Sequence, residues 1–243
     1  MCEKCSGQLG RRSFLKLAGA AGIAIGIAIG IGAGLAPSSA RASGATTHVT
    51  ADEALARLKA GNAKYTTAPQ LCEADLAESR RHSAPNQEPW AAILGCADSR
   101  VPPELLFGGL NVGEIFVARN AGNMADTATM GTLEYGALAL GIPLIVVLGH
   151  ERCGAVAAAC DMVSKKATFP GSIGPMAKAI SKTARDMVGK PGDFVDNVVR
   201  ESARRTAQLI GKSPVVAPLV KSGKVKIVTA RYDLTTGTVE FFA

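Results

Sequence analysis

Aromatic side chains are scarce in this sequence and make up only 5% of its 243 residues. No basic stripe is interleaved with aromatic residues in the way that single-strand nucleic-acid binders use. The formal net charge of +7 is concentrated at the start of the chain, because residues 1–42 hold five basic residues against one acidic residue and so carry four of the seven charges. We therefore expect no nucleic-acid partner.

Cysteine is too infrequent for a disulfide scaffold, since the chain has six cysteines at uneven spacing. The first two fall within residues 1–42. We expect Cys72 and Cys160 to be free or incidentally paired thiols, and the alternative is a disulfide that forms late. Only Cys96 and Cys153 stand beside other residues that suggest chemistry. Of the three histidines, His48 and His82 lie in polar surroundings and are expected at the surface.

Charge is absent from a long stretch near the N-terminus, from Leu17 to Ala40. The run Arg11-Arg12-Ser13-Phe14-Leu15-Lys16 precedes this stretch and is typical of a twin-arginine export signal. Ala40-Arg41-Ala42 supplies a cleavage site, so we expect residues 1–42 to be a signal peptide. The mature domain, residues 43–243, would then be periplasmic or extracellular. The alternative is a retained membrane anchor, because the uncharged stretch is long enough to span a bilayer.

Three short apolar runs indicate buried strands, at Trp90–Cys96, Glu114–Arg119 and Ile142–Gly149. A helix is predicted between the second and third runs, from Thr127 to Leu140. Strands that alternate with helices of this length favour a parallel sheet with right-handed crossovers. The predicted fold class is therefore α/β, with a mostly parallel central β-sheet flanked by helices.

The two ends of the domain are expected to add a helical arm and a hairpin. Thr50 and Glu53 form a capping-box pattern that predicts a helix to about Tyr65, and a second helix is plausible from Cys72 to His82. Further helices are predicted at 154–165, 173–188 and 193–211. At the C-terminus, Val225–Ala230 and Thr238–Phe242 read as the two strands of a hairpin.

Residues that bind metals follow two of the predicted buried strands. Cys96 ends the first strand, and His150 and Cys153 follow the third. Ligands of open parallel sheets bind beyond the carboxyl ends of the strands, so these residues are expected to converge. Two thiolates and one imidazole favour zinc and leave one coordination position open, as in catalytic sites.

Each of these residues also has an ordinary structural interpretation. A cysteine at the end of an apolar strand is often a small buried side chain, and a single histidine often has only a structural hydrogen bond. Asp98 and Arg100 could form a plain salt bridge. The joint pattern favours a site, because Cys-x-Asp-x-Arg and His-x-x-Cys at two strand ends would rarely coincide without one.

The motifs that carry these residues are similar to those of the β-class carbonic anhydrases. The similarity extends over roughly residues 50–242 and rests on four segments: Cys96–Pro102, Phe116–Asn123, Leu133–Tyr135 and Gly149–Gly154. The resemblance implies reversible hydration of carbon dioxide to bicarbonate and a proton by zinc-bound hydroxide. It further implies the zinc ligands Cys96, His150 and Cys153, the catalytic pair Asp98 and Arg100, and the substrate-binding residues Gln87, Phe116, Tyr135 and Gly154.

Two departures from the family pattern qualify these expectations. Ile93 stands where members whose sites close in response to bicarbonate carry tryptophan, so the resemblance favours an open site in which Arg100 holds Asp98 away from the metal. Ala121 is smaller than the branched residue expected there, which predicts a roomier pocket. We expect the N-terminal helices that begin at the Thr50 cap to wrap a partner subunit, which gives a homodimer or a larger even assembly. The resemblance implies that Gln87 reaches across this interface toward the partner's metal.

Two other functions remain open at this point. A zinc hydrolase on the same scaffold could act on carbonyl sulfide or carbon disulfide, because the same nucleophile would attack those linear molecules. A non-catalytic protein could instead use the zinc for structure, which requires a fourth protein ligand such as Cys160. Cys160 lies two helical turns beyond Cys153, too far to share the metal easily.

Overall fold

Five strands form one sheet in the computed structural model, which describes residues 47–68 and 76–242. The strand order is β2-β1-β3-β4-β5, and only β5 runs antiparallel to its neighbour. The strands are β1 (Ala91–Cys96), β2 (Ile115–Asn120), β3 (Leu144–His150), β4 (Lys226–Tyr232) and β5 (Val239–Phe242). The predicted α/β class, with its mostly parallel sheet, is confirmed, and so is the C-terminal hairpin.

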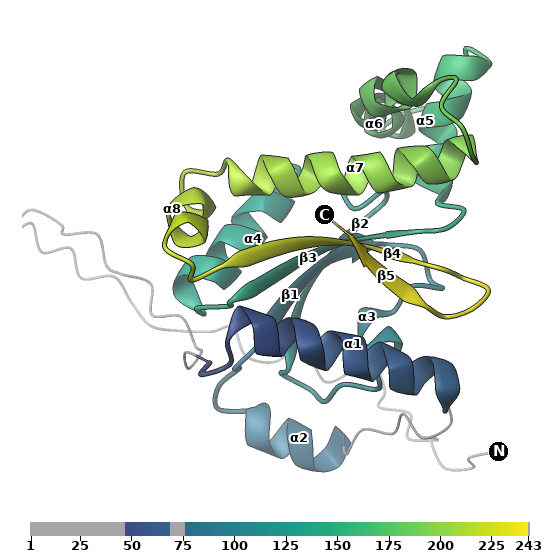
Figure 1. Cartoon of the computed structure of the whole chain (residues 1–243). Coiled ribbons are helices and arrows are strands. Elements are labelled where there is room, and N and C mark those ends of the chain that lie inside the picture. Colours follow the sequence, from purple (N-terminus) through teal and green to yellow (C-terminus); the bar gives the residue numbers. More distant parts are fainter. Residues whose placement is uncertain (1–46, 69–75, 243) are drawn as a thin grey trace, which may run out of the picture. The chain divides into compact units, whose positions relative to one another are not determined.

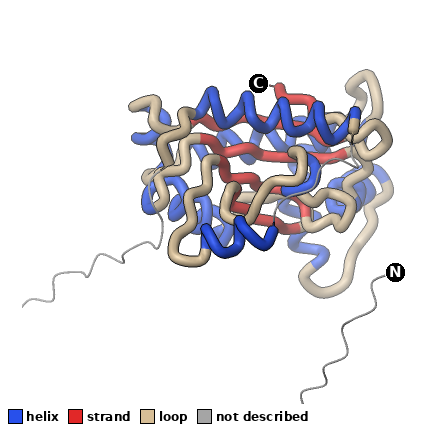
Figure 2. Tube along the Cα trace, turned by 90° about the horizontal axis from the view of Figure 1, so that it is seen from below, coloured by secondary structure: helices blue, strands red, loops and turns tan. Residues whose placement is uncertain are grey.

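Helices cover the sheet in two layers. They are α1 (Ala51–Thr67), α2 (Leu76–Ser83), α3 (Pro103–Leu106), α4 (Thr127–Ala139), α5 (Gly154–Ser164), α6 (Ile173–Met187), α7 (Phe194–Gly211) and α8 (Val216–Lys221). In Figure 1 the sheet separates α1 and α2 below from α4, α7 and α8 above. Figure 2, seen from below, shows the strands side by side within one layer.

The alternation of side chains along the strands explains why both faces are covered. In β1, Ile93 belongs to a buried cluster with Leu58 of α1, whereas Leu94 belongs to a cluster with Leu133 of α4 and Ile210 of α7. All residues of β1 and of β3 are buried. A strand that is buried on both faces reads as a continuous apolar run, which is the pattern that the sequence displayed.

The second predicted strand is confirmed in place but wrong in burial. We expected Glu114–Arg119 to be buried on both faces, whereas Ala118 is the only buried residue of β2. The reason is topological, because β2 is the edge strand of the sheet that the described residues form, where it pairs with β1 alone. An edge strand of this kind presents unpaired main-chain groups on one side.

The helix predictions differ from the structure mainly at their ends. Thr50 caps α1 through the predicted capping box, since its hydroxyl accepts from the Glu53 amide and the Glu53 carboxylate accepts from the Thr50 amide. The helix predicted from Cys72 begins at Leu76 among the described residues, and its first four residues lie outside them. The short helices α3 and α8 were not predicted.

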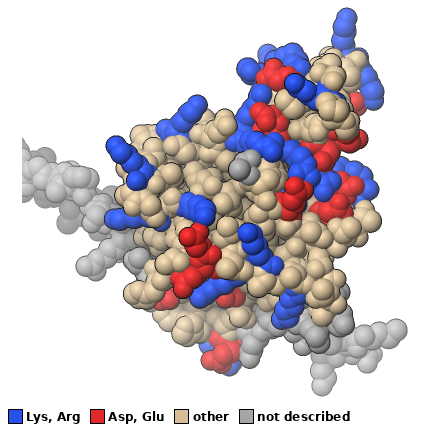
Figure 3. Space-filling model, in the orientation of Figure 1, with Lys and Arg blue, Asp and Glu red and all other residues tan. Residues whose placement is uncertain are grey.

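Charged side chains of both signs lie beside one another on the face shown in Figure 3. On α6 and α7, for example, Asp186 pairs with Lys182 and with Arg205, and Arg205 also pairs with Glu201. Within the described part of the chain, no helix is both long and apolar enough to cross a bilayer. The predicted signal, residues 1–42, and the predicted cleavage site lie outside the described residues.

Candidate metal centre

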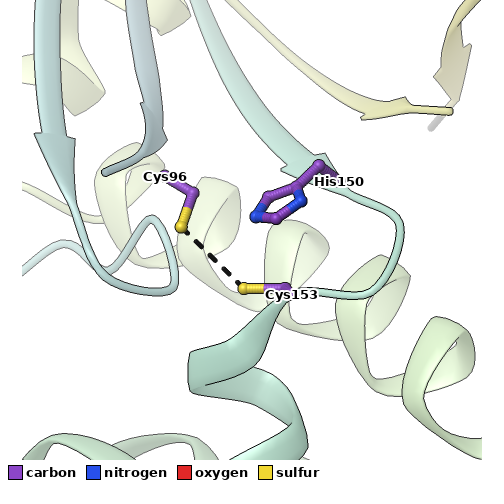
Figure 4. A group of neighbouring side chains, drawn as sticks. All are labelled: Cys96, His150 and Cys153. Atoms are coloured by element: carbon purple, nitrogen blue, oxygen red, sulfur yellow. Dashed lines mark hydrogen bonds between the residues drawn. The ribbon is translucent and has the colours of Figure 1, made fainter. Parts of the chain in front are cut away.

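Three predicted ligands come together beyond the carboxyl ends of the two central strands. Cys96 is the last residue of β1, His150 is the last residue of β3, and Cys153 is the N-cap of α5. Because β1 and β3 are parallel neighbours, with Gly95 level with Leu148, their final residues meet at the same edge. Figure 4 shows the two sulfurs and the imidazole ring pointing toward one another.

The spacing of the ligand atoms suits a tetrahedral metal. One atom from each of Cys96, His150 and Cys153 lies within 4.8 Å of the others, and all three residues are buried. The two sulfurs are 3.9 Å apart. Two zinc–sulfur bonds of about 2.3 Å at a tetrahedral angle would place sulfurs about 3.8 Å apart. The donor set and its spacing therefore fit zinc.

The imidazole of His150 is oriented for coordination. Its Nδ1 lies 2.9 Å from the carbonyl oxygen of Glu151, a contact in which the ring nitrogen must donate. Nε2 is then the nitrogen with a free lone pair, and it is buried without a hydrogen-bond partner among the described residues. A buried polar atom without a partner is costly, and a metal ion would remove that cost.

The two thiols are electrostatically unequal. A hydrogen bond joins the two sulfurs, and it lowers the pKa of Cys96 to about 4. The Gly122 amide, 3.4 Å from the same sulfur, also stabilises the thiolate. Sharing of the proton between the two sulfurs raises the pKa of Cys153 well above its usual range. Zinc binding would replace the proton, so we expect metal uptake to release it.

Asp98 and Arg100 form a paired contact beside the three ligands. Arg100 donates its Nε to Oδ1 of Asp98 at 2.9 Å and its Nη2 to Oδ2 at 2.7 Å, and its backbone amide also donates to Oδ1. These bonds hold the pKa of Asp98 well below its usual range. Oδ2 of Asp98 also lies 3.9 Å from Nε2 of His150, so the carboxylate borders the space that the ligands enclose.

Comparison with known proteins decides the family. The family model described as carbonic anhydrase matches residues 91–239. This chain belongs to the carbonic anhydrase family. Carbonic anhydrase 2 of Mycobacterium tuberculosis (strain H37Rv) is 34% identical over 185 residues, which cover 74% of this chain and 87% of that protein. The carbonic anhydrase of Mycolicibacterium smegmatis is also 34% identical, over 75% of this chain and 89% of its own length.

Solved structures place the chain in the β class of this family. The Coccomyxa β-carbonic anhydrase in complex with acetazolamide has a TM-score of 0.60 and 29% identity, and the match covers 68% of this chain and 76% of that one. A tetrameric β-carbonic anhydrase from Sordaria macrospora has the same fold, with a TM-score of 0.60 at 20% identity. That match covers 69% of this chain and 89% of that one.

Of the other predicted residues of this carbonic anhydrase, Phe116 lies apart from the ligands, whereas Gly154 directly follows the predicted ligand Cys153. Phe116 is level with Ala92, four residues before Cys96, so it lies about 13 Å away along the strands. Its ring contacts the ring of Tyr135, with centroids 6.3 Å apart, and Tyr135 is 40% exposed. Gln87 is half-buried ahead of β1, and Gly154 is exposed as the first residue of α5.

Cys160 is a buried free thiol that does not join the ligand cluster formed by the described residues. Burial is the main cause that raises its pKa to about 11. The interpretation in which Cys160 supplies a fourth protein ligand therefore has no geometric support. Cys72, the other expected thiol, lies outside the described residues.

Sequence reasoning missed the residues that hold the Cys96–Asp98 loop in place. Arg119, at the end of β2, donates its Nε to the Cys96 carbonyl at 2.8 Å and its Nη2 to the Asp98 carbonyl at 2.6 Å. Asn120 accepts from the Ala97 amide through its carbonyl. Both residues stand within the segment Phe116–Asn123, but their spacing gave no sign of contact with a different strand end.

Proposed function

We propose that this carbonic anhydrase uses one zinc ion, held by Cys96, His150 and Cys153, to interconvert carbon dioxide and bicarbonate. The observation that carries the proposal is the convergence of two thiols on a buried imidazole nitrogen that has no partner among the described residues. Zinc in such a site supplies a hydroxide nucleophile near neutral pH, because the metal lowers the pKa of a bound water.

Asp98 and Arg100 would act as the catalytic pair. The carboxylate of Asp98 borders the ligand cluster and can accept a hydrogen bond from the nucleophile, which directs the nucleophile's lone pair at carbon dioxide. Arg100 donates two side-chain bonds to that carboxylate and so keeps it from becoming a ligand itself. Ile93, in place of the tryptophan of bicarbonate-closed members, supports an open site of this kind.

Zinc content and rate measured on the same purified sample test the proposal. We expect one zinc per chain and rapid hydration of carbon dioxide. The same sample should be assayed with carbonyl sulfide and carbon disulfide, and release of sulfide without carbon dioxide hydration would favour the alternative hydrolase. A zinc-loaded protein that acts on none of the three substrates would support a structural role for the metal.

A second subunit would complete the substrate pocket. Phe116 lies about 13 Å along the strands from the level of Cys96 in its own chain. Its ring contacts that of Tyr135 on α4, so the two rings would line a metal site only in a partner. The edge position of β2 and the exposed Leu138 of α4 leave this side available for such a contact. We infer a homodimer or a larger even assembly, with Gln87 also directed toward the partner.

The assembly is expected to be required for activity. Solution scattering with light scattering should give the mass of a dimer or of an even multiple of it. Leu138→Arg on the exposed face of α4 should shift the protein toward monomers and lower the activity, since a desolvated charge opposes the contact. Val188→Arg, on an exposed position after α6, is the control. A monodisperse and fully active wild-type monomer would contradict the proposal.

The rate of hydration is expected to rise through mildly alkaline pH. Two thiolates offset the charge of the metal, so the bound water should lose its proton later than at an all-histidine site. Asp98 should stay ionised throughout, because Arg100 holds its pKa below the usual range. A rate profile from about pH 6.5 to 9 would measure this rise. A flat profile, or inhibition by bicarbonate beyond that of a reaction product, would contradict it.

Export by the twin-arginine route is part of the proposal and rests on Arg11, Arg12 and the uncharged stretch that follows. N-terminal sequencing of the mature protein should begin at Ser43. Substitution of both arginines by lysine should leave the enzyme in the cytoplasm with its precursor mass. A chain that starts at Met1 and fractionates with membranes would favour the retained anchor.

A further inference from the structure

The end of β2 makes several polar contacts with the loop that carries Cys96 and Asp98. The guanidinium of Arg119 spans the Cys96 and Asp98 carbonyls, at 2.8 and 2.6 Å. Between these two carbonyls, the Ala97 amide donates to the Asn120 carbonyl at 3.0 Å. The Gly122 amide then donates to the Cys96 sulfur at 3.4 Å. The loop between a predicted ligand and the predicted catalytic carboxylate is thus held at each of its residues.

The guanidinium of Arg119 donates to two main-chain carbonyls, which carry no net charge. No carboxylate among the described residues pairs with it. Its side chain reaches across from β2, where Arg119 is level with Gly95 of β1. The register of β1 and β2 is already set by parallel pairing from Ala91 with Ile115 to Cys96 with Asn120, so the sheet does not need these two bonds. Their specific effect is to fix the Cys96 and Asp98 main chain relative to each other.

We propose that Arg119 is a positioning residue that sets the separation between the Cys96 sulfur and the Asp98 carboxylate. Arg100 donates to the side-chain carboxylate of Asp98, and Arg119 donates to the main-chain carbonyl of the same residue. Because Oδ2 of Asp98 is only 3.9 Å from Nε2 of His150, a small shift of the loop would bring the carboxylate within reach of the metal. The inference rests on the proposed zinc site.

The variant Arg119→Met keeps the length and apolar stem of the side chain but removes its donors. We expect it to keep one zinc per chain and to lose about 10- to 100-fold in kcat. This range is typical for the loss of residues that orient metal ligands through hydrogen bonds. KM should change little, because the donors of Arg119 bond to main chain. Arg119→Lys should recover part of the rate, since an ammonium can reach one carbonyl but lacks the rigid fork. The control is Arg57→Met, because Arg57 in the wild type lies over the ring of Trp90 and makes no contact with the Cys96–Asp98 loop among the interactions described.

A spectroscopic measurement separates positioning from general destabilisation. In the cobalt-substituted wild type, azide should bind the exchangeable position and change the visible spectrum. In Arg119→Met the azide response should weaken, because Asp98 occupies that position in part of the molecules. In the double variant Arg119→Met with Asp98→Asn, the response should return, because the neutral amide is a poorer ligand. Asp98→Asn alone should respond like the wild type.

The outcomes distinguish the inference from the proposed function. If Arg119→Met has the kcat and the azide response of the wild type, Arg119 does not position Asp98. If the variant loses its metal, or if the double variant fails to recover the azide response, the residue supports the fold or the ligand set and the inference is wrong. If the wild type itself binds neither zinc nor cobalt, the proposed function fails, and the inference fails with it.

Discussion

Replacement of Cys96 by Ser is expected to leave the protein without zinc and without measurable hydration of carbon dioxide. Cys96, His150 and Cys153 supply all of the protein donors in the cluster, and two remaining donors hold zinc too weakly for a stable site. His150→Ala and Cys153→Ser should have the same effect. Zinc content by mass spectrometry and the initial rate, measured on the same preparations, would check this prediction.

Cys160→Ala is the matched control for these variants. Cys160 is also a buried free thiol, and it lies on α5 together with the helix cap Cys153, but it does not belong to the cluster. The control should keep one zinc per chain and the activity of the wild type. Full zinc occupancy in any one of the three ligand variants would remove that residue from the ligand set.

Arg100→Ala is expected to abolish most of the activity while zinc remains bound. The substitution removes both side-chain bonds to Asp98, so the carboxylate is free to move toward the cluster, which it already borders at 3.9 Å from Nε2 of His150. A carboxylate on the metal would exclude the nucleophile. We expect a loss near the upper end of the 10- to 100-fold range, with unchanged zinc content.

Arg205→Ala provides the comparison for this variant. Arg205 also pairs with carboxylates, those of Asp186 and Glu201, but these pairs lie on the surface of α6 and α7. Its loss should leave the rate unchanged. A zinc-bound wild-type structure at acidic pH is the stricter test, because ligation of zinc by Asp98 beside an intact Arg100 would refute the open-site interpretation.

The central strands could be predicted because a strand that is buried on both faces consists of a short, continuous run of apolar residues. Both β1 and β3 are buried along their whole length, and both end in the residues that the sequence marked as ligands. The burial of β2 was not predictable in this way, because its edge position depends on strand order rather than on its own residues. The helices α3 and α8 have four and six residues, too few for a helical period to show.

The candidate site was predictable where the ligands follow strands directly. The contacts of Arg119 were not, because an arginine at a strand end gives no indication of which carbonyls it will reach. The Nδ1 contact of His150 could not be predicted either, because its acceptor is a main-chain carbonyl. Every residue has such a carbonyl, so the residue types do not indicate which one is used. The placement of Phe116 away from the predicted metal ligands of its own chain required the strand register.

The parallel pairing of β1 with β3 would also make the proposed zinc ion a reporter of folding. A slip of one residue between these strands would move His150 about 3.3 Å along the sheet and reverse its face relative to Cys96. The two ligands would then be too far apart to share an ion. During refolding, tight zinc uptake should therefore coincide with correct pairing of the two central strands, and a zinc-sensitive dye would time that event directly.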